Sequence, residues 1–215
     1  RAGQSGDTMG FREMLQGVRV VDDTISVHQE MLKRSVSLGH LPMLINNLKE
    51  APGHRAAINI LDRRRLCDYL RVDPGELIDI LAWAMENPSD PEIVPSEEAS
   101  VMQNKMEVVD LTALPIPWHY PEDGGRYQSA SIIIAQYGGV RNTSFHRQLL
   151  LVSTHTVSRF VPRHLKTMTN KANDSGDEIP IAVVNGPDPM VLLAGAMSFE
   201  EPLDELRVAA ALHER

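Results

Sequence analysis

Three prolines that lie close together, Pro88, Pro91 and Pro95, constrain the fold of this chain more than any other feature of its sequence. Proline has no backbone N–H and restricts the residue before it, so a helix cannot continue through this stretch. We therefore expect an extended linker between two regions. Helix and strand patterns mix in the first region and hairpin-like patterns dominate the second, which favours an α+β fold.

The first region, residues 9–106, is expected to form a small N-terminal α/β domain. Asp73, Pro74 and Glu76 are typical of a helix start, with Asp73 as the cap, and the apolar spacing after them predicts a helix that reaches Met85. Further helices are expected over residues 11–15, 22–34 and 63–70, and strands over residues 41–48 and 56–60.

The second region, residues 107–215, is richer in strand signals. The two prolines of Leu114–Pro117 predict extended backbone, and the glycine pairs at 124–125 and 138–139 predict turns. Residues 142–152 alternate as a strand does. Strands are expected over residues 131–135, 142–152, 157–161 and 179–184, the last of them buried, and helices over residues 162–172, 189–197 and 203–215.

Composition excludes several classes of protein. A net charge of −8 argues against general nucleic-acid binding, and we expect Arg63–Arg65 to be the solvated face of a helix. No apolar run approaches the ~20 residues of a membrane span. The single cysteine, Cys67, falls in an apolar helical pattern and is expected to be buried. These features predict a protein of the reducing cytoplasm.

The two ends of the chain also carry expectations. Residues 1–8 are polar and rich in small side chains, and we expect a disordered leader there rather than a signal peptide. Residues 203–215 have helical periodicity with no capping glycine after them, which indicates a chain truncated at its C-terminus.

Four polar residues are candidates for chemistry, although each also has an ordinary structural interpretation. Asn142 and Arg147 are five apart, so a regular strand would place them on opposite faces unless a bulge intervenes. His164 suits a hydrogen-bonded loop position. Glu205 stands beside Asp204 on the polar side of an amphipathic helix, where a carboxylate is normally solvated. Spacing alone leaves both interpretations open, because no local motif of known metal-binding strength is present.

Several motifs, taken together and in this order, resemble the UbiD family of reversible decarboxylases. The motifs are Leu114–Pro117, Asp123–Tyr127, Gly139–Arg147, Pro162–His164 and Asp204–Leu206. The GVRN-xxxx-R pattern that follows the DGGRY turn is the most specific of them. The resemblance extends from about Phe11 to the end of the chain and is closest to the archaeal-type branch.

The resemblance implies a small α/β domain followed by a split β-barrel-like domain, residues 107–215 and incomplete here, that binds prenylated FMN. It further implies that Asn142, His164 and Glu205 are metal ligands. The ion would be Mn²⁺ or Mg²⁺, with K⁺ as a further ion, and it would bridge to the cofactor phosphate. An amide, an imidazole and a carboxylate form a mostly hard ligand set that suits such ions.

The resemblance also gives expectations for the other site residues. Arg147 matches the catalytic arginine beside the reacting carbon, where a guanidinium would hold the substrate carboxylate. The family glutamate that acts as general acid belongs to a later segment, so we expect the 215-residue chain alone to be inactive. Expected contacts with the cofactor come from Ser129, Ser131, His146, Arg147, Arg163 and Met197.

The implied activity is the reversible, non-oxidative decarboxylation of an α,β-unsaturated or aromatic acid. Such an acid would be anhydromevalonate phosphate in isoprenoid synthesis or a polyprenyl-hydroxybenzoate in ubiquinone synthesis. A flavin prenyltransferase would supply the cofactor, and the full-length protein would be a homo-oligomer.

Two other interpretations remain open at this stage. The chain could be an FMN-binding split-barrel module, either a flavin reductase or an accessory subunit, without decarboxylase activity. Its polar residues could also serve only the hydrogen bonding of the core. Convergence of Asn142, His164 and Glu205 on one point would favour the decarboxylase.

Overall fold

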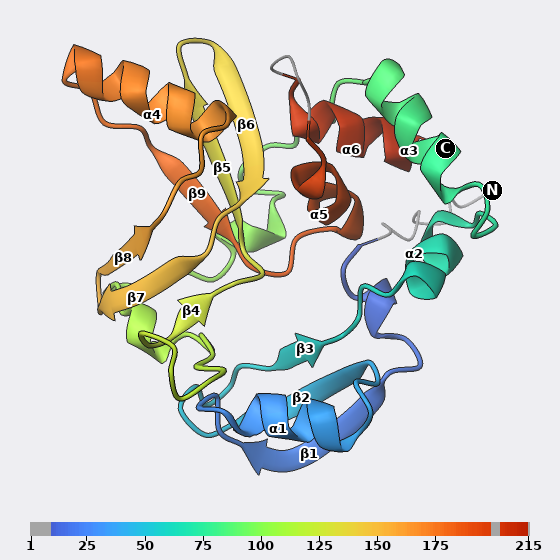
Figure 1. The fold of residues 1–215 in the computed structure, drawn as a ribbon, viewed down its shortest axis with the longest axis vertical. Helices are drawn as coiled ribbons and strands as arrows, with labels where there is room; N and C mark the ends of the chain where they lie inside the picture. The colour runs from blue at the N-terminus through green and yellow to red at the C-terminus, as the bar shows by residue number, and fades with distance from the viewer. Residues whose placement is uncertain (1–9, 199–202, 215) are drawn as a thin grey trace.

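The computed structural model describes residues 10–198 and 203–214, and in these residues helices and strands are mixed (Figure 1). The predicted leader, residues 1–8, lies outside the described residues. The strands form three separate three-stranded sheets, with the orders β1-β2-β3, β4-β7-β8 and β6-β5-β9. The mixed helix and sheet class is therefore confirmed. The sheets do not close into a barrel within the described residues, and the split barrel stays a prediction.

The elements have the following bounds. The strands are β1 (Arg19–Ile25), β2 (Met43–Leu48), β3 (Ala56–Ile58), β4 (Tyr127–Gln128), β5 (Ile132–Tyr137), β6 (Val140–Phe145), β7 (Gln148–Val152), β8 (His155–Ser158) and β9 (Ile181–Val184). The α-helices are α1 (Glu30–Ser37), α2 (Arg63–Leu70), α3 (Leu77–Glu86), α4 (His164–Ser175), α5 (Pro189–Ala196) and α6 (Glu205–His213). The 3₁₀ helices are η1 (Glu13–Leu15), η2 (Ser100–Met102) and η3 (Leu111–Ala113).

The first sheet forms a small unit with its own core. β1 and β2 are parallel and are joined through α1, whereas β3 pairs antiparallel with β2. Apolar residues from both strands and from the helix are buried together, as the alternation within β2 requires. They are Val21, Ile25, Val27, Met31, Met43, Ile45, Leu48 and Ala51.

The predicted helix over residues 22–34 is wrong, because its first part belongs to β1 and α1 begins only at Glu30. Val21 and Ile25 are the buried residues of β1, and their spacing of four suits a helix as well as a strand. A register shift between Val21 and Thr24 also removes the simple alternation that identifies a strand. Pairing with β2 decides the outcome.

A second core joins the two regions of the chain. Figure 1 shows α2 and α3 beside α5 and α6, although the two pairs are far apart in the sequence. Tyr69 of α2 donates a hydrogen bond of 2.9 Å to Asp188, which caps α5. The predicted boundary at 106/107 stays a prediction. The buried residues of this core are Met14, Ile60, Leu66, Tyr69, Ile80 and Ala84 from the first region, and Met190, Ala194, Val208, Ala209, Ala211 and Leu212 from the second.

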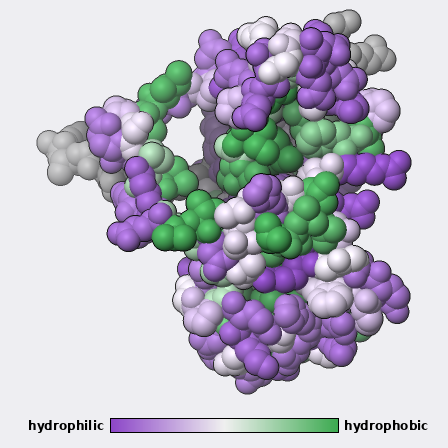
Figure 2. Space-filling model, turned by 90° about the vertical axis from the view of Figure 1, so that its left-hand side faces the viewer, coloured by the Kyte–Doolittle hydropathy of each residue, from purple (hydrophilic) through white to green (hydrophobic). Residues whose placement is uncertain are grey.

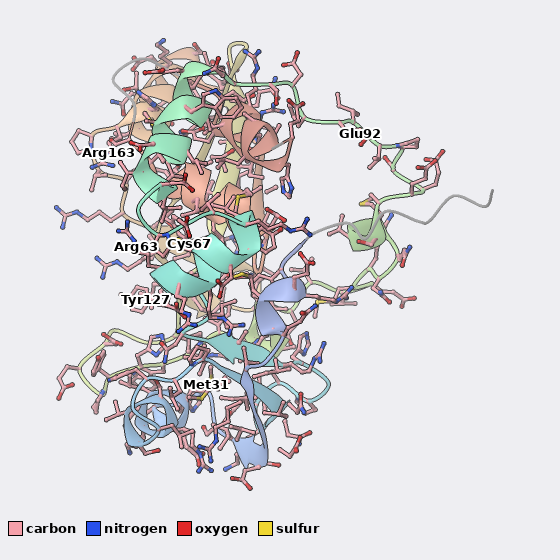
Figure 3. The ribbon with its side chains drawn as sticks, turned by 90° about the vertical axis from the view of Figure 1, so that its right-hand side faces the viewer. Met31, Arg63, Cys67, Glu92, Tyr127 and Arg163 are labelled. Carbon is pink, nitrogen blue, oxygen red and sulfur yellow. The ribbon has the colours of Figure 1, made fainter. Side chains whose placement is uncertain are left out.

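The proline-rich stretch is extended, as expected, and leaves apolar side chains in solvent. Figure 3 shows Glu92 on a segment that extends away from α2 and α3. Between α3 and η3 the only regular element described is η2, and Ile93 and Val108 are largely exposed on this stretch.

Two local predictions for the first region need correction. Helix α3 begins at Leu77, because residues 74–76 form a turn in which the Glu76 carboxylate accepts the Asp73 amide at 3.2 Å. Arg65 is not solvated but donates to the backbone oxygens of Met14 and, at 2.8 Å, of Gln16. Arg63 and Arg64 are exposed and Cys67 is buried, as predicted.

Arg126 organises the extended Leu114–Pro117 motif. Its guanidinium donates to the backbone oxygens of Thr112 at 3.0 Å, Leu114 at 2.6 Å and Ile116 at 2.9 Å. Trp118, which follows the motif, donates its amide to the Val27 oxygen at 2.9 Å. The motif is therefore held between the small first sheet and the strand-rich region.

The predicted strand over residues 142–152 is two strands in two sheets. β6 ends at Phe145 after pairing with β5, and β7 begins at Gln148 and pairs with β4 and β8. Alternation continues across the break, so it carries no signal of the change in partner. β9 is also mostly exposed rather than buried, because it lies at the edge of its sheet and pairs only with β5 within the described residues.

Within residues 10–198 and 203–214, every helix is too short or too polar to cross a membrane.

Helix α5 approaches the β5–β6 hairpin closely at Gly195. A Cβ atom at this position would lie 2.8 Å from Ile132 Cδ1 and 3.4 Å from the Thr143 oxygen. We predict that Gly195→Val lowers the free energy of unfolding by about 1–3 kcal/mol through overpacking. Gly75→Val is the matched control, because no atom lies within 4 Å of that Cβ. Urea denaturation measures both variants, and equal losses would contradict the predicted close contact.

Candidate active site

A buried amide and a buried carboxylate meet between β6 and α6. Asn142 Nδ2 donates to Glu205 Oε1 at 2.8 Å, and the Thr143 amide donates to Glu205 Oε2 at 2.8 Å. Asn142 and Glu205 are only 4% and 3% exposed. The ordinary interpretation of Glu205 as a solvated carboxylate is therefore wrong, and two of the three predicted ligands are in direct contact.

The neighbouring residues hold this contact in place. Asp204 caps α6 by accepting the Leu206 amide at 3.0 Å, which places Glu205 in the first turn of the helix. The same carboxylate pairs with Arg141, whose Nε lies 2.9 Å from Asp204 Oδ2 and whose Nη2 contacts the same oxygen. Two consecutive residues of β6, Arg141 and Asn142, thus bind two consecutive residues at the start of α6, Asp204 and Glu205.

The environment of Glu205 leaves its charge uncompensated. Burial raises the pKa of the Glu205 carboxyl to about 7, against the lowering effect of the hydrogen bonds from Thr143 and Asn142, and the nearby Asp204 raises it further. No Lys, Arg or His side chain forms an ion pair with it within the described residues. A buried carboxylate in this situation needs a proton or a cation, so the pair fits a divalent ion.

Ser144 and His146 extend the hydrogen bonding from Asn142. Ser144 Oγ donates to Asn142 Oδ1 at 2.8 Å and lies 3.0 Å from His146 Nε2. The His146 ring packs edge-on against Phe160, with ring centroids 4.9 Å apart. Burial, and then the charge of Arg163, lower the pKa of His146, which keeps the ring neutral near pH 7.

Ser144 was not among the predicted site residues, although the sequence carries a signal that it belongs with them. Asn142, Ser144 and His146 are alternate residues, so in extended backbone they share one face. A row of polar side chains at this spacing on a buried strand indicates a hydrogen-bonded chain.

The structure does not bring His164 into hydrogen-bond contact with either partner. His164 is half-buried and is the first residue of α4, and no hydrogen bond links it to Asn142 or Glu205 within the described residues. Its helix nevertheless covers the right sheet, because Leu165 and Met168 pack on Ile133 and Ala135 of β5. The part of the chain described has no cluster of three His, Cys, Asp or Glu side chains that could hold a metal. The third ligand therefore stays a prediction.

The two predicted cofactor serines lie in different environments. Ser131 is 1% exposed, and its hydroxyl accepts a hydrogen bond of 3.0 Å from Gln148 Nε2. Ser129 is exposed and lines a cleft of about 1360 Å³. Ser131 is thus already engaged within the protein, whereas Ser129 is open to a ligand.

The remaining predicted cofactor residues lie at the margins of the site. Arg147 is exposed at the break between β6 and β7, where neither sheet constrains it. Arg163 is exposed just before α4, and its charge acts on His146. Met197 follows α5 and is half-buried against the second core. Their roles at a cofactor stay predictions.

The cleft that Ser129 lines is not centred on the Asn142–Glu205 pair. It lies between the first sheet and the strand-rich region, and Phe145, at the far end of β6, borders it. Figure 2 shows hydrophobic side chains gathered across the middle of one face of the molecule, between more hydrophilic upper and lower parts. The buried polar contacts identify the candidate site better than this cleft does, because the size of a cleft does not show which side chains could react or bind an ion.

Comparison with known families decides the relationship. The family described as UbiD, 3-octaprenyl-4-hydroxybenzoate carboxy-lyase Rift-related domain, matches residues 92–215, which include every predicted site residue. The chain belongs to the UbiD family.

Individual UbiD relatives cover nearly the whole chain. It is 34% identical over 200 residues to an anhydromevalonate phosphate decarboxylase of Methanothermobacter thermautotrophicus, which is 91% of this chain and 46% of that protein. Over 173 residues it is 34% identical to the enzyme of the same name from Archaeoglobus fulgidus, which is 79% of this chain and 39% of that protein. The predicted likeness to the archaeal-type branch agrees with these names.

Solved structures give the same result. An evolved dimeric form of the UbiD-class enzyme HmfF from Pelotomaculum thermopropionicum, in complex with prFMN, superposes with a TM-score of 0.90 at 29% identity. The match covers 95% of this chain and 50% of that one. This UbiD chain therefore spans about half the length of the relatives it matches.

The buried charge of Glu205 should make stability depend on pH in the absence of divalent ions. Because its folded-state pKa, about 7, exceeds the ordinary value of 4.5, folding favours the protonated form. The contribution of Glu205 to the free energy of unfolding is therefore highest below pH 4.5 and falls, by up to about 3 kcal/mol, as the pH rises from 4.5 through 7.

Glu205→Gln should remove this fall, whereas Glu86→Gln, at an exposed position of α3, should keep it. Urea denaturation in EDTA at a series of pH values measures all three proteins. A profile of Glu205→Gln that parallels the wild type would contradict the assignment.

Asp204 should contribute to stability in two separable ways. Asp204→Ala loses both the helix cap, about 1 kcal/mol, and the pair with Arg141, about 1 kcal/mol. Asp204→Ser keeps a capping oxygen and should lose only the second contribution. A double-mutant cycle with Arg141→Gln isolates the pair, and a coupling energy near zero would show that the contact does not hold β6 to α6.

Proposed function

We propose that this protein is the metal- and cofactor-binding part of a decarboxylase that uses prenylated FMN and a divalent ion on an unsaturated or aromatic acid. The observation that supports it most is the buried Asn142–Glu205 contact, in which the carboxylate has no cationic partner among the residues that the structure describes. Membership of the UbiD family and the names of the relatives, which are decarboxylases, support the reaction class.

Asn142 and Glu205 would hold the metal through their oxygens, and His164 would be the third ligand. Glu205 Oε1 and Oε2 each accept one hydrogen bond, so each oxygen keeps a lone pair for a cation. The hard ligand set favours Mn²⁺ or Mg²⁺. The bound ion would neutralise both Glu205 and a cofactor phosphate, and a K⁺ ion could add to this neutralisation.

The flavin would lie near the break between β6 and β7, within a split-barrel domain of residues 107–215 that follows the domain of residues 9–106. Ser129, Arg163 and Met197 would contact it, with Ser131 and His146 in support. That the HmfF structure contains prFMN supports this cofactor. Once bound, prenylated FMN would supply an electron sink for the carbon that loses CO₂.

Arg147 would act on the substrate itself. Its exposed guanidinium at the β6–β7 break is free to form a two-point contact with a carboxylate, which fixes the acid for loss of CO₂. The same positive charge would stabilise the negative charge that develops during the reaction.

The names of the relatives support one substrate class. The name anhydromevalonate phosphate decarboxylase supports a phosphorylated unsaturated acid and a role in isoprenoid synthesis. A polyprenyl-hydroxybenzoate of ubiquinone synthesis is the second substrate class. A flavin prenyltransferase would supply the cofactor, and the protein would act as a homo-oligomer. The single buried cysteine suits the cytoplasm.

Binding measurements test this function directly. We expect prenylated FMN to bind the chain with a Kd at least ~10-fold lower when Mn²⁺ is present, because the ion bridges protein and phosphate. Glu205→Gln and His164→Ala should each remove the Mn²⁺ effect. His155→Ala, at the exposed start of β8, is the control and should retain it.

The outcome separates the two candidate functions. Binding of ordinary FMN without any dependence on Mn²⁺ would favour a flavin-binding module and would overturn the decarboxylase proposal. Release of CO₂ by the full-length protein from anhydromevalonate phosphate, compared with a hydroxybenzoate, then distinguishes the two substrate classes.

A further inference from the structure

The Ser144 hydroxyl lies between two atoms, each of which can accept its single hydrogen. Asn142 Oδ1 is 2.8 Å away and His146 Nε2 is 3.0 Å away. A serine hydroxyl donates one hydrogen bond and accepts others. When it donates to Asn142 Oδ1, it must accept from His146, so His146 carries its hydrogen on Nε2.

This polarity is set by Glu205 at the other end of the chain of contacts. Both oxygens of Glu205 accept hydrogen bonds, one from Asn142 Nδ2 and one from the Thr143 amide, so Asn142 turns its NH₂ group toward Glu205 and its oxygen toward Ser144. Every hydrogen bond in the chain is then donated in the direction of Glu205: His146 donates to Ser144, Ser144 to Asn142, and Asn142 to Glu205.

A bound cation reverses this requirement. A carboxamide binds a hard ion through its oxygen, whereas Asn142 turns its NH₂ group toward Glu205, so the amide must turn before both side chains can bind one ion. If the amide turns, its NH₂ group donates to Ser144 Oγ. Ser144 then donates to His146 Nε2, and the His146 hydrogen resides on Nδ1.

We propose that Asn142, Ser144 and His146 form a reversible hydrogen-bond relay that turns the Asn142 amide from Glu205 to a bound divalent ion. Ser144 and His146 are positioning residues in this relay. The inference rests on the proposed function, because it requires the metal to bind at Asn142 and Glu205.

The surroundings of His146 suit such a relay. The ring is only 9% exposed and packs edge-on against Phe160, which restricts its rotation. A neutral imidazole has one N–H and one acceptor nitrogen; in the exchange the Nε2 hydrogen leaves to solvent and a solvent hydrogen adds to Nδ1, so the charge does not change. The number of hydrogens on the three side chains is therefore the same in both states.

NMR of the 215-residue chain with ¹⁵N-labelled histidine tests the relay. Mg²⁺ is the probe, because it is diamagnetic and suits the same hard ligands. We expect the His146 hydrogen on Nε2 in EDTA and on Nδ1 with saturating Mg²⁺. The signal is assigned by its loss in His146→Phe.

Variants test whether the relay contributes to metal affinity. Ser144→Ala should raise the Kd for Mn²⁺, measured by calorimetry, by about 10–100-fold, as is typical when a side chain that orients a ligand is removed. Ser144→Thr keeps the hydroxyl and should restore most of the affinity.

Thr154→Val is the matched control. It removes another hydroxyl–histidine contact, 2.7 Å between Thr154 Oγ1 and His155 Nδ1, at an exposed turn. The Kd for Mn²⁺ should not change. Unfolding curves of all variants, recorded without metal, show whether each is folded.

The outcomes distinguish failure of the relay from failure of the proposed function. Mn²⁺ binding with no change of the His146 tautomer, or with wild-type affinity in Ser144→Ala, would overturn the relay and leave the proposed function intact. Failure of the wild-type chain to bind Mn²⁺ would overturn both. A tautomer change together with rescue by Ser144→Thr would establish the relay.

Discussion

The buried contact between Glu205 and β6 is the interaction on which the arrangement of the site depends. It fixes the start of α6 against the β5–β6 hairpin, and Gly195 lets α5 approach the same hairpin closely. A carboxylate that is 3% exposed and has no cationic partner in residues 10–198 and 203–214 is unfavourable for folding. Its hydrogen bonds from Asn142 and Thr143 offset only part of that cost. Such local conflicts with stability are characteristic of functional sites.

Local sequence signals predicted much of the fold. The helix over residues 63–70 matches α2, and the strand over residues 41–48 contains β2, because in each case the apolar spacing agrees with the final burial. The predictions failed where a distant partner decides the conformation. β1 is a strand because β2 lies beside it, and β6 separates from β7 because the two pair with different strands.

The site was less predictable from residue patterns than from family resemblance. Spacing alone left Glu205 open between a solvated position and a site, since nothing in its own helix signals that β6 will cover it. The resemblance singled out Asn142 and Glu205, and the two do touch. The pair between Arg141 and Asp204 was not foreseen, because it joins residues 63 apart whose proximity only the folded chain reveals.

The core that α2 and α3 share with α5 and α6 has a consequence for how the polypeptide acquires its structure. Tyr69 meets Asp188 across 119 residues of sequence, so the early helices emerge from the ribosome long before the surfaces that cover them. Until then the apolar faces of α2 and α3 have no native partner to pack against. Closing so long a loop is slow, and the nascent protein is therefore vulnerable to aggregation in the interval before α5 and α6 are made.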